Sequence, residues 1–145
     1  MTFSQIEHGS EQYQQELALR DEVLRRPLGL KISDDDLSRE PHQWHFGLFK
    51  EESIIACVIA VPRSDTEAQI RQMAVSADFQ GMGLGRKIMQ QVEEALQKKG
   101  TSRLFLHARV PVIDFYRKLG YSPSGDIFEE VGIPHQKMQK LLGDC

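Results

Sequence analysis

The sequence predicts a single α/β domain, spanning residues 1–145, in which helices flank a mixed, mostly antiparallel sheet. Three strand-like segments at residues 44–49, 54–61 and 68–76 are separated by polar turns, which favours an antiparallel meander. An amphipathic helix over residues 83–99 and a short strand at 103–108 follow. Because strand, crossover helix and strand join in the right-handed sense, the strands at 68–76 and 103–108 should be parallel neighbours.

The segments before the meander have weaker patterns. Residues 2–7 are expected to form a first strand, and Ser10 to cap a helix that begins at Glu11. Pro27 is expected to end this helix, since proline disfavours the helical conformation of the residue before it. Residues 28–43 are polar and predict a loop.

Charged residues in this N-terminal part are expected to be solvated. Arg20, Arg25 and Arg26 lie near the end of the first helix, where positive charge suits the helix dipole. Ser33 is expected to cap a helical turn at residues 34–37, whose adjoining carboxylates form an acidic run of the usual solvated kind. The five histidines and two cysteines show no paired ligand spacing, so we predict no metal site.

The last third of the chain is expected to add one helix and two strands. Pro111 suits the first turn of a helix, and Gly120 ends it. Two closing strands follow from Tyr121 onward, the second at about residues 135–141.

Composition excludes several classes of protein. The net charge of the 145 residues is −3 and no basic block is present, so nucleic-acid binding is not expected. The longest apolar run, residues 54–61, is too short to span a membrane and instead predicts a central strand covered on both faces. Cys57 lies in that run as a packing residue and Cys145 is terminal, which fits a cytoplasmic protein without a disulfide framework.

A glycine-rich stretch joins the third meander strand to the amphipathic helix. Its alternating glycines expose backbone, and the helix behind them begins with unpaired N–H groups at the positive end of its dipole. Such a loop can hold a phosphate or pyrophosphate. We therefore predict that the cofactor contacts Gln80, Gly81, Met82, Gly83, Leu84, Gly85, Arg86 and Lys87.

Two common phosphate-binding motifs do not fit this stretch. A Walker loop requires serine or threonine after its lysine, but Lys87 precedes Ile88. A Rossmann fingerprint requires a third glycine where Arg86 stands. That fingerprint also follows the first strand of a βαβ unit, whereas several expected strands precede the glycine-rich stretch here.

Two motifs resemble those of the GNAT N-acetyltransferases. The family's Gln/Arg-x-x-Gly-x-Gly/Ala loop, which binds the pyrophosphate of acetyl-CoA, is matched by Gln80, Gly83 and Gly85. Its later Phe-Tyr-x-x-x-Gly-Phe/Tyr pattern is matched by Phe115, Tyr116, Gly120 and Tyr121. The two motifs occur in the family's order, and the resemblance is strongest from about residue 69 to 120.

The resemblance implies a cofactor site between two strands. In the family the sheet splays after strands that correspond to those ending near Ser76 and Ala108, and acetyl-pantetheine lies in the gap. Backbone N–H groups near Met73, Ala74 and Val75 would polarise the thioester carbonyl, and Tyr116 would protonate the departing thiolate.

The C-terminal segment narrows the resemblance to the subgroup that includes the glyphosate N-acetyltransferases. Its Phe128-Glu129 and Gly132-Ile133-Pro134-His135 stretches are similar to that subgroup. The resemblance implies that His135 is the base and that the acceptor's anionic group is held by Arg25, Arg71 and Arg109. The adjoining Arg26 is the alternative to Arg25.

These residue types suit the chemistry. A protonated amine must lose a proton before it attacks a thioester, and histidine titrates nearest to neutral pH. Arginine presents a planar fork to a carboxylate or phosphonate. The sequence therefore predicts transfer of an acetyl group from acetyl-CoA to a small, anionic amine acceptor by direct attack. Two alternative functions stay open: a protein or peptide N-acetyltransferase, and a non-catalytic acyl-CoA-binding module. Whether the protein assembles as a homodimer also stays open.

Overall fold

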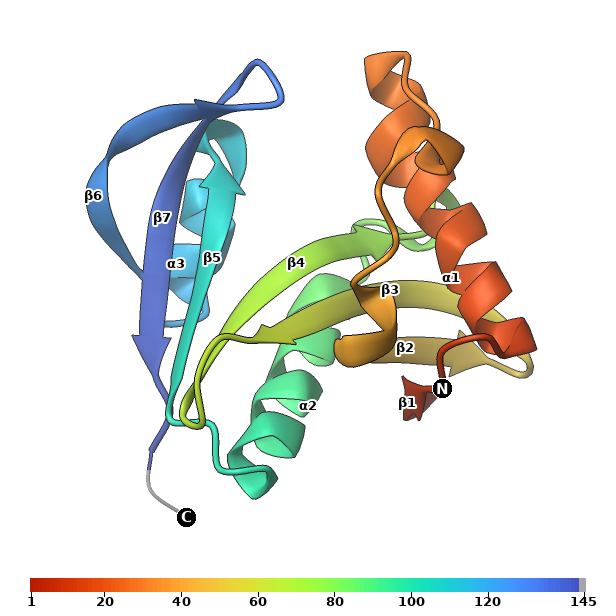
Figure 1. Cartoon of the computed structure of the whole chain (residues 1–145), viewed down its shortest axis with the longest axis horizontal. Coiled ribbons are helices and arrows are strands. Elements are labelled where there is room, and N and C mark those ends of the chain that lie inside the picture. Colours follow the sequence, from red (N-terminus) through yellow and green to blue (C-terminus); the bar gives the residue numbers. More distant parts are fainter. Residues whose placement is uncertain (144–145) are drawn as a thin grey trace.

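A computed structural model describes residues 1–143, and Cys145 lies outside the described part. Within that part seven strands form one sheet in the order β1-β2-β3-β4-β5-β7-β6 (Figure 1). The strands are β1 Thr2–Ile6, β2 Trp44–Lys50, β3 Ser53–Pro62, β4 Glu67–Val75, β5 Arg103–Arg109, β6 Ser122–Glu130 and β7 Ile133–Leu141. The α-helices are α1 Glu11–Arg20, α2 Leu84–Lys98 and α3 Ile113–Lys118. The prediction of a mixed, mostly antiparallel sheet flanked by helices is confirmed.

Helices cover both faces of the meander β2–β3–β4 (Figure 1). From α2, five side chains pack into the main core on one face: Leu84, Ile88, Met89, Val92 and Leu96. From α1, Tyr13 and Leu19 pack on the opposite face, with Leu19 against Cys57. Consequently β3 is buried from both sides, as its continuous apolar run predicts. No helix within residues 1–143 is long and apolar enough to cross a membrane.

The sheet opens between β4 and β5. These strands pair in parallel only where residues 67–70 face residues 103–106, and they then diverge, as Figure 1 shows. Residues 71–75 of β4 therefore have no strand partner on the β5 side in the described chain. The parallel neighbours and the splay are both as predicted.

A β-bulge changes the direction of β4 just after Ile70, the last β4 residue that pairs with β5. Cys57 pairs with Ala74 and Ile59 with Arg71, so two β4 residues face Val58 alone. One of them, Gln72, has a φ of 57°. A bulge leaves a residue unpaired and increases the local twist, which turns the end of β4 away from β5.

The helical stretch after Ser10 differs from prediction at its end. Ser10 does cap it, since its hydroxyl accepts the Tyr13 N–H at 3.2 Å. Regular α-helix stops at Arg20, a π-helical turn covers Asp21–Arg25, and Pro27 lies inside a 3₁₀ turn at Arg26–Leu28. The Asp21 carboxylate accepts the Ile32 N–H at 2.8 Å, which ties the returning loop to the helical turn.

One further prediction of local structure is wrong. The expected turn at residues 34–37 is instead a 3₁₀ turn at Ile32–Asp34, and Asp36 accepts the Ser38 N–H at 3.0 Å. The second closing strand is confirmed; it begins two residues earlier than expected, at Ile133, where it already pairs with β6.

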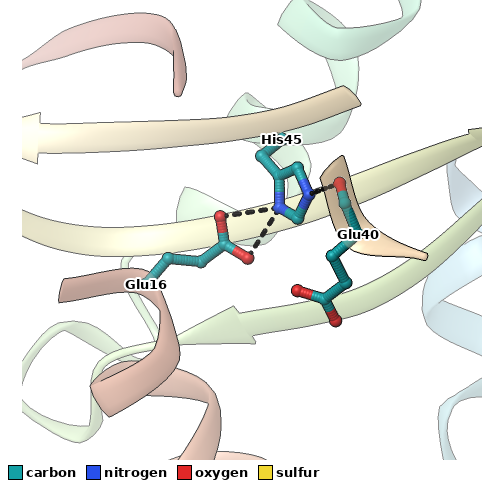
Figure 2. Close-up of side chains that lie close together, drawn as sticks. All are labelled: Glu16, Glu40 and His45. Carbon is teal, nitrogen blue, oxygen red and sulfur yellow. Dashed lines mark hydrogen bonds and ion pairs between the residues drawn. The ribbon is translucent and has the colours of Figure 1, made fainter. Parts of the chain in front are cut away.

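Arg20 is buried rather than solvated. Its guanidinium contacts the Glu16 carboxylate at 2.9 Å and both oxygens of Glu40 at 2.7 and 2.8 Å. His45 completes this cluster, with Nδ1 at 2.9 Å from Glu16 and Nε2 at 3.0 Å from the Glu40 carbonyl. Figure 2 shows these contacts of His45 with Glu16 and Glu40. The carboxylates and imidazole lie within 4.8 Å of one another, a grouping that suits a cation, and Arg20 supplies that positive charge internally.

The buried groups set one another's ionisation. Burial alone would raise the pKa of Glu40, but hydrogen bonds from Arg20 and Tyr13 lower it. Burial alone would lower the pKa of His45, but the hydrogen bond and charge of Glu16 raise it. Both directions favour the charged forms, which is the condition under which a buried ion pair holds together.

We predict that Arg20→Met lowers the free energy of unfolding by about 3–5 kcal/mol, because the buried Glu40 would lose its ion-pair partner and Glu16 would keep only His45, while the space stays filled. Arg26→Met is the matched control, since that side chain is 69% exposed and should have little effect. Urea unfolding followed by circular dichroism measures the difference. Equal stability of the two variants would contradict a structural role for the ion network.

Candidate active site

One cavity of about 710 Å³ occupies the opening between β4 and β5. Its wall is built from the free half of β4, the glycine-rich loop, the end of β5, α3 and the β6–β7 turn. Most residues predicted for the site line it: Arg25, Arg71, Met73, Val75, Gln80, Gly81, Gly83, Leu84, Gly85, Arg86, Arg109, Tyr116 and His135. The opening of the sheet therefore brings together residues from across the sequence.

Three residues predicted to bind the cofactor do not line the cavity. Ala74 is buried on the other face of β4 and packs near Leu19. Met82 is 60% exposed, and the side chain of Lys87 also faces solvent.

Each glycine of the loop has a different local reason. Gly81 and Gly83 have φ values of +80° and +78°, a conformation that other residues adopt with strain. A Cβ at Gly85 would stand 3.1 Å from the Phe115 ring, so α2 could not approach α3 as closely. Gln80 donates a side-chain N–H to the Val75 carbonyl at 3.1 Å, which fastens the loop to the end of β4.

The start of α2 is open to an anion. Its N-cap is Gly83, which has no side chain to satisfy the first N–H groups, and its first turn carries no acidic residue. Arg86 lines the cavity at the same place. Helix N-termini of this kind attract phosphate groups, since unpaired N–H groups and the helix dipole act together.

The arginines in the cavity are not equivalent. Arg25 is ion-paired with Asp35 at 2.9 Å and also contacts the Gln72 side chain at 3.3 Å. Asp35 is thus not a solvated member of an acidic run. In contrast, Arg71 and Arg109 form no ion pair within residues 1–143, so their charges are available to a ligand.

Tyr116 lies on α3 with 8% of its surface exposed, and its ring packs edge-on against Phe115 and Tyr121. Burial raises the pKa of its hydroxyl to about 12. The hydroxyl therefore keeps its proton at neutral pH and can donate it to an acceptor in the cavity.

His135 lies on β7, opposite Arg109 of β5 and Phe128 of β6 in the strand register. Its Nδ1 is 2.7 Å from the Ile133 carbonyl, which can only accept a hydrogen bond. In the neutral ring Nδ1 therefore carries the proton, and Nε2 is the atom with a free lone pair.

Two titratable residues of the cavity lining, His107 and Glu130, were not predicted from the sequence. His107 Nδ1 lies 3.4 Å from a carboxylate oxygen of Glu130, and the same oxygen lies 3.8 Å from His135 Nε2. His107 stands two residues before Arg109 on one strand, so strand alternation could have placed it on the same face. No sequence signal could have found Glu130, because its place depends on how β6 pairs with β7.

Comparison with known proteins gives a consistent family. Residues 12–142 match the family described as "Acetyltransferase (GNAT) domain". An uncharacterised protein of Bacillus subtilis, YyaT, is 36% identical over 75 residues, which cover 52% of this chain and 51% of that protein. The chain thus spans about half the length of this curated relative.

Solved structures share the fold over nearly the whole chain. A candidate N-acetyltransferase from Lactobacillus plantarum superposes with a TM-score of 0.86 at 21% identity, covering 98% of this chain and 99% of that one. A GNAT family acetyltransferase from Elizabethkingia anophelis, crystallised with acetyl-CoA, gives a TM-score of 0.72 at 16% identity and covers 97% of each chain.

Proposed function

Because this chain belongs to the GNAT acetyltransferase family, we propose that it is an N-acetyltransferase that moves an acetyl group from acetyl-CoA to a small, anionic amine acceptor. The observation that carries the proposal is one continuous cavity. It runs from the uncapped start of α2, through the gap between β4 and β5, to Arg71 and Arg109. The proposal includes the likeness to the glyphosate N-acetyltransferases. That likeness rests on Ala108-Arg109, Phe115-Tyr116, Phe128-Glu129 and Gly132-Ile133-Pro134-His135.

The residues at the glycine-rich loop fit the pyrophosphate of acetyl-CoA. The N–H groups at the start of α2 have no side-chain cap, and Arg86 adds positive charge beside them. After Ile70 the edge of β4 that faces β5 has no strand partner, so backbone groups near Met73 are free to contact a carbonyl. Bound there, acetyl-CoA supplies an acetyl group activated as a thioester.

Two side chains move the protons in this mechanism. His135 Nε2 takes a proton from the acceptor's ammonium group, which frees the nitrogen lone pair. The nitrogen forms a bond to the acetyl carbon while the bond from that carbon to sulfur breaks. Tyr116, which is protonated at neutral pH, gives its proton to the departing sulfur. The nitrogen then gives its second proton to the tyrosine oxygen, which restores Tyr116 and leaves a neutral amide, and solvent removes the proton from the histidine.

We predict that acetyl-CoA raises the melting temperature of the wild-type protein, because a ligand that binds only the native state stabilises it. Gly83→Asp should lose this shift, since a carboxylate would meet the pyrophosphate at the start of α2. Gly83→Ala is the control, because it carries the same backbone strain without the charge. If acetyl-CoA raised the melting temperature of Gly83→Asp as much as that of the wild type, the loop would not be part of the cofactor site.

We predict that Tyr116→Phe lowers kcat by about 100-fold or more, as expected for loss of a general acid. The melting shift produced by acetyl-CoA should stay unchanged. Tyr121→Phe is the matched control: that hydroxyl donates to Glu93 at 2.8 Å and lies outside the cavity, so kcat should be kept. Wild-type turnover by Tyr116→Phe would exclude the tyrosine from the mechanism.

We predict that Arg71→Ala and Arg109→Ala each raise the acceptor KM by roughly tenfold or more, the loss expected for a charge-assisted hydrogen bond. Arg103→Ala is the control, since that residue lies at the far end of β5 and outside the cavity. A panel of amines, assayed by release of free thiol from acetyl-CoA, measures the effect. If neutral amines react as well as their carboxylated analogues, a peptide acceptor becomes the better hypothesis.

A further inference from the structure

Glu130 is the only carboxylate among the described residues that line the cavity. The basic residues there are Arg25, Arg71, Arg86 and Arg109, of which only Arg25 has an acidic partner. An acceptor amine enters as a positively charged ammonium ion, which this arrangement would repel. A negative group at the site of attack would remove that conflict, and Glu130 is the one residue of the lining that can provide it.

The position of Glu130 suits such a role. One of its carboxylate oxygens lies 3.8 Å from His135 Nε2, the atom with the free lone pair, and 3.4 Å from His107 Nδ1. His107 Nδ1 is buried and forms no good hydrogen bond within residues 1–143. The Phe128 ring packs against both imidazoles, edge-on to His107 at 5.0 Å and stacked with His135 at 6.1 Å. Glu130 therefore lies beside the candidate base.

An ammonium group fits between these atoms. It has three N–H donors, of which His135 Nε2 can accept one and a carboxylate oxygen of Glu130 another. The side chain of Glu130 is 40% exposed and that of His135 only 7%, so Glu130 also faces the route by which an acceptor arrives. Once His135 has taken the proton, the new positive charge remains within 3.8 Å of the same carboxylate.

We propose that Glu130 is a specificity-determining residue that receives the ammonium group of the acceptor. The proposal rests on the proposed function, since it concerns the acceptor side of the same cavity. Arg109 of β5 and His135 of β7 are opposite each other in the strand register. The anionic group and the amine would therefore be bound on adjacent strands. The acceptor class is therefore a compact molecule with an ammonium and an anionic group a few bonds apart.

Binding of paired probes tests this role without relying on turnover. The probes are glycine, β-alanine and aminomethylphosphonate, each compared with the same anion lacking the amine: acetate, propionate and methylphosphonate. Affinities are measured by calorimetry on the full chain saturated with coenzyme A. The wild type should bind at least one amine more tightly than its partner anion.

Glu130→Gln should weaken binding of that amine by roughly tenfold or more and leave the partner anion unchanged. Arg109→Ala should weaken both members of the pair. Glu129→Gln is the matched control, because Glu129 is the exposed neighbour on β6 and lies outside the cavity. Its affinities and melting temperature should equal those of the wild type, and the melting temperature of Glu130→Gln should match.

The proposal is overturned if Glu130→Gln weakens amine and anion equally, if it weakens neither, or if no amine binds better than its partner anion. Failure of the proposed function would look different. In that case no amine would release thiol from acetyl-CoA, while preferential binding of the amine and its loss in Glu130→Gln would still report on Glu130.

Discussion

The short pairing between β4 and β5 is the constraint on which the candidate site depends. The two strands share one parallel register over residues 67–70 and 103–106, and the sheet opens immediately afterwards. A bulge at Gln72 then twists the free half of β4. Full pairing would satisfy every backbone group but would leave no cavity. The opening instead creates a cavity that is lined by the unpaired edge of β4, by Tyr116 and by the start of α2. One backbone feature therefore creates both the space and its polar lining.

A buried ion network supports one wall of this opening. Arg20 joins α1 to Glu40 of the returning loop, and Glu16 joins α1 to His45 of β2. The next helical turn carries Arg25, whose pairing with Asp35 and contact with Gln72 connect the loop to the bulge. The charged groups inside α1 therefore contribute to the shape of the cavity without facing it. Because both Arg20 and Glu16 are almost fully buried, loss of either charge would leave its partners uncompensated.

Local patterns predicted the parts of the structure that are locally determined. The amphipathic period of α2, the cap at Ser10 and the apolar run of β3 all gave elements where they were expected, because each depends on neighbours in sequence. The glycine-rich loop was found for the same reason. Arg20 was predicted wrongly since Glu40 and His45, its buried environment, lie twenty or more residues away along the chain. Glu130 joined the site only because β7 inserts between β5 and β6, a pairing order that no local pattern reveals.

The central claim is that the gap between β4 and β5 holds the reacting end of acetyl-CoA, with the acceptor side lined by Arg109, Glu130 and His135. A crystal structure of the protein with acetyl-CoA tests it most directly. The account predicts the pyrophosphate against the backbone of residues 81–86 and the thioester carbonyl beside Met73, within reach of the Tyr116 hydroxyl. A coenzyme bound elsewhere, or a thioester that points away from the gap between the two strands, would contradict it.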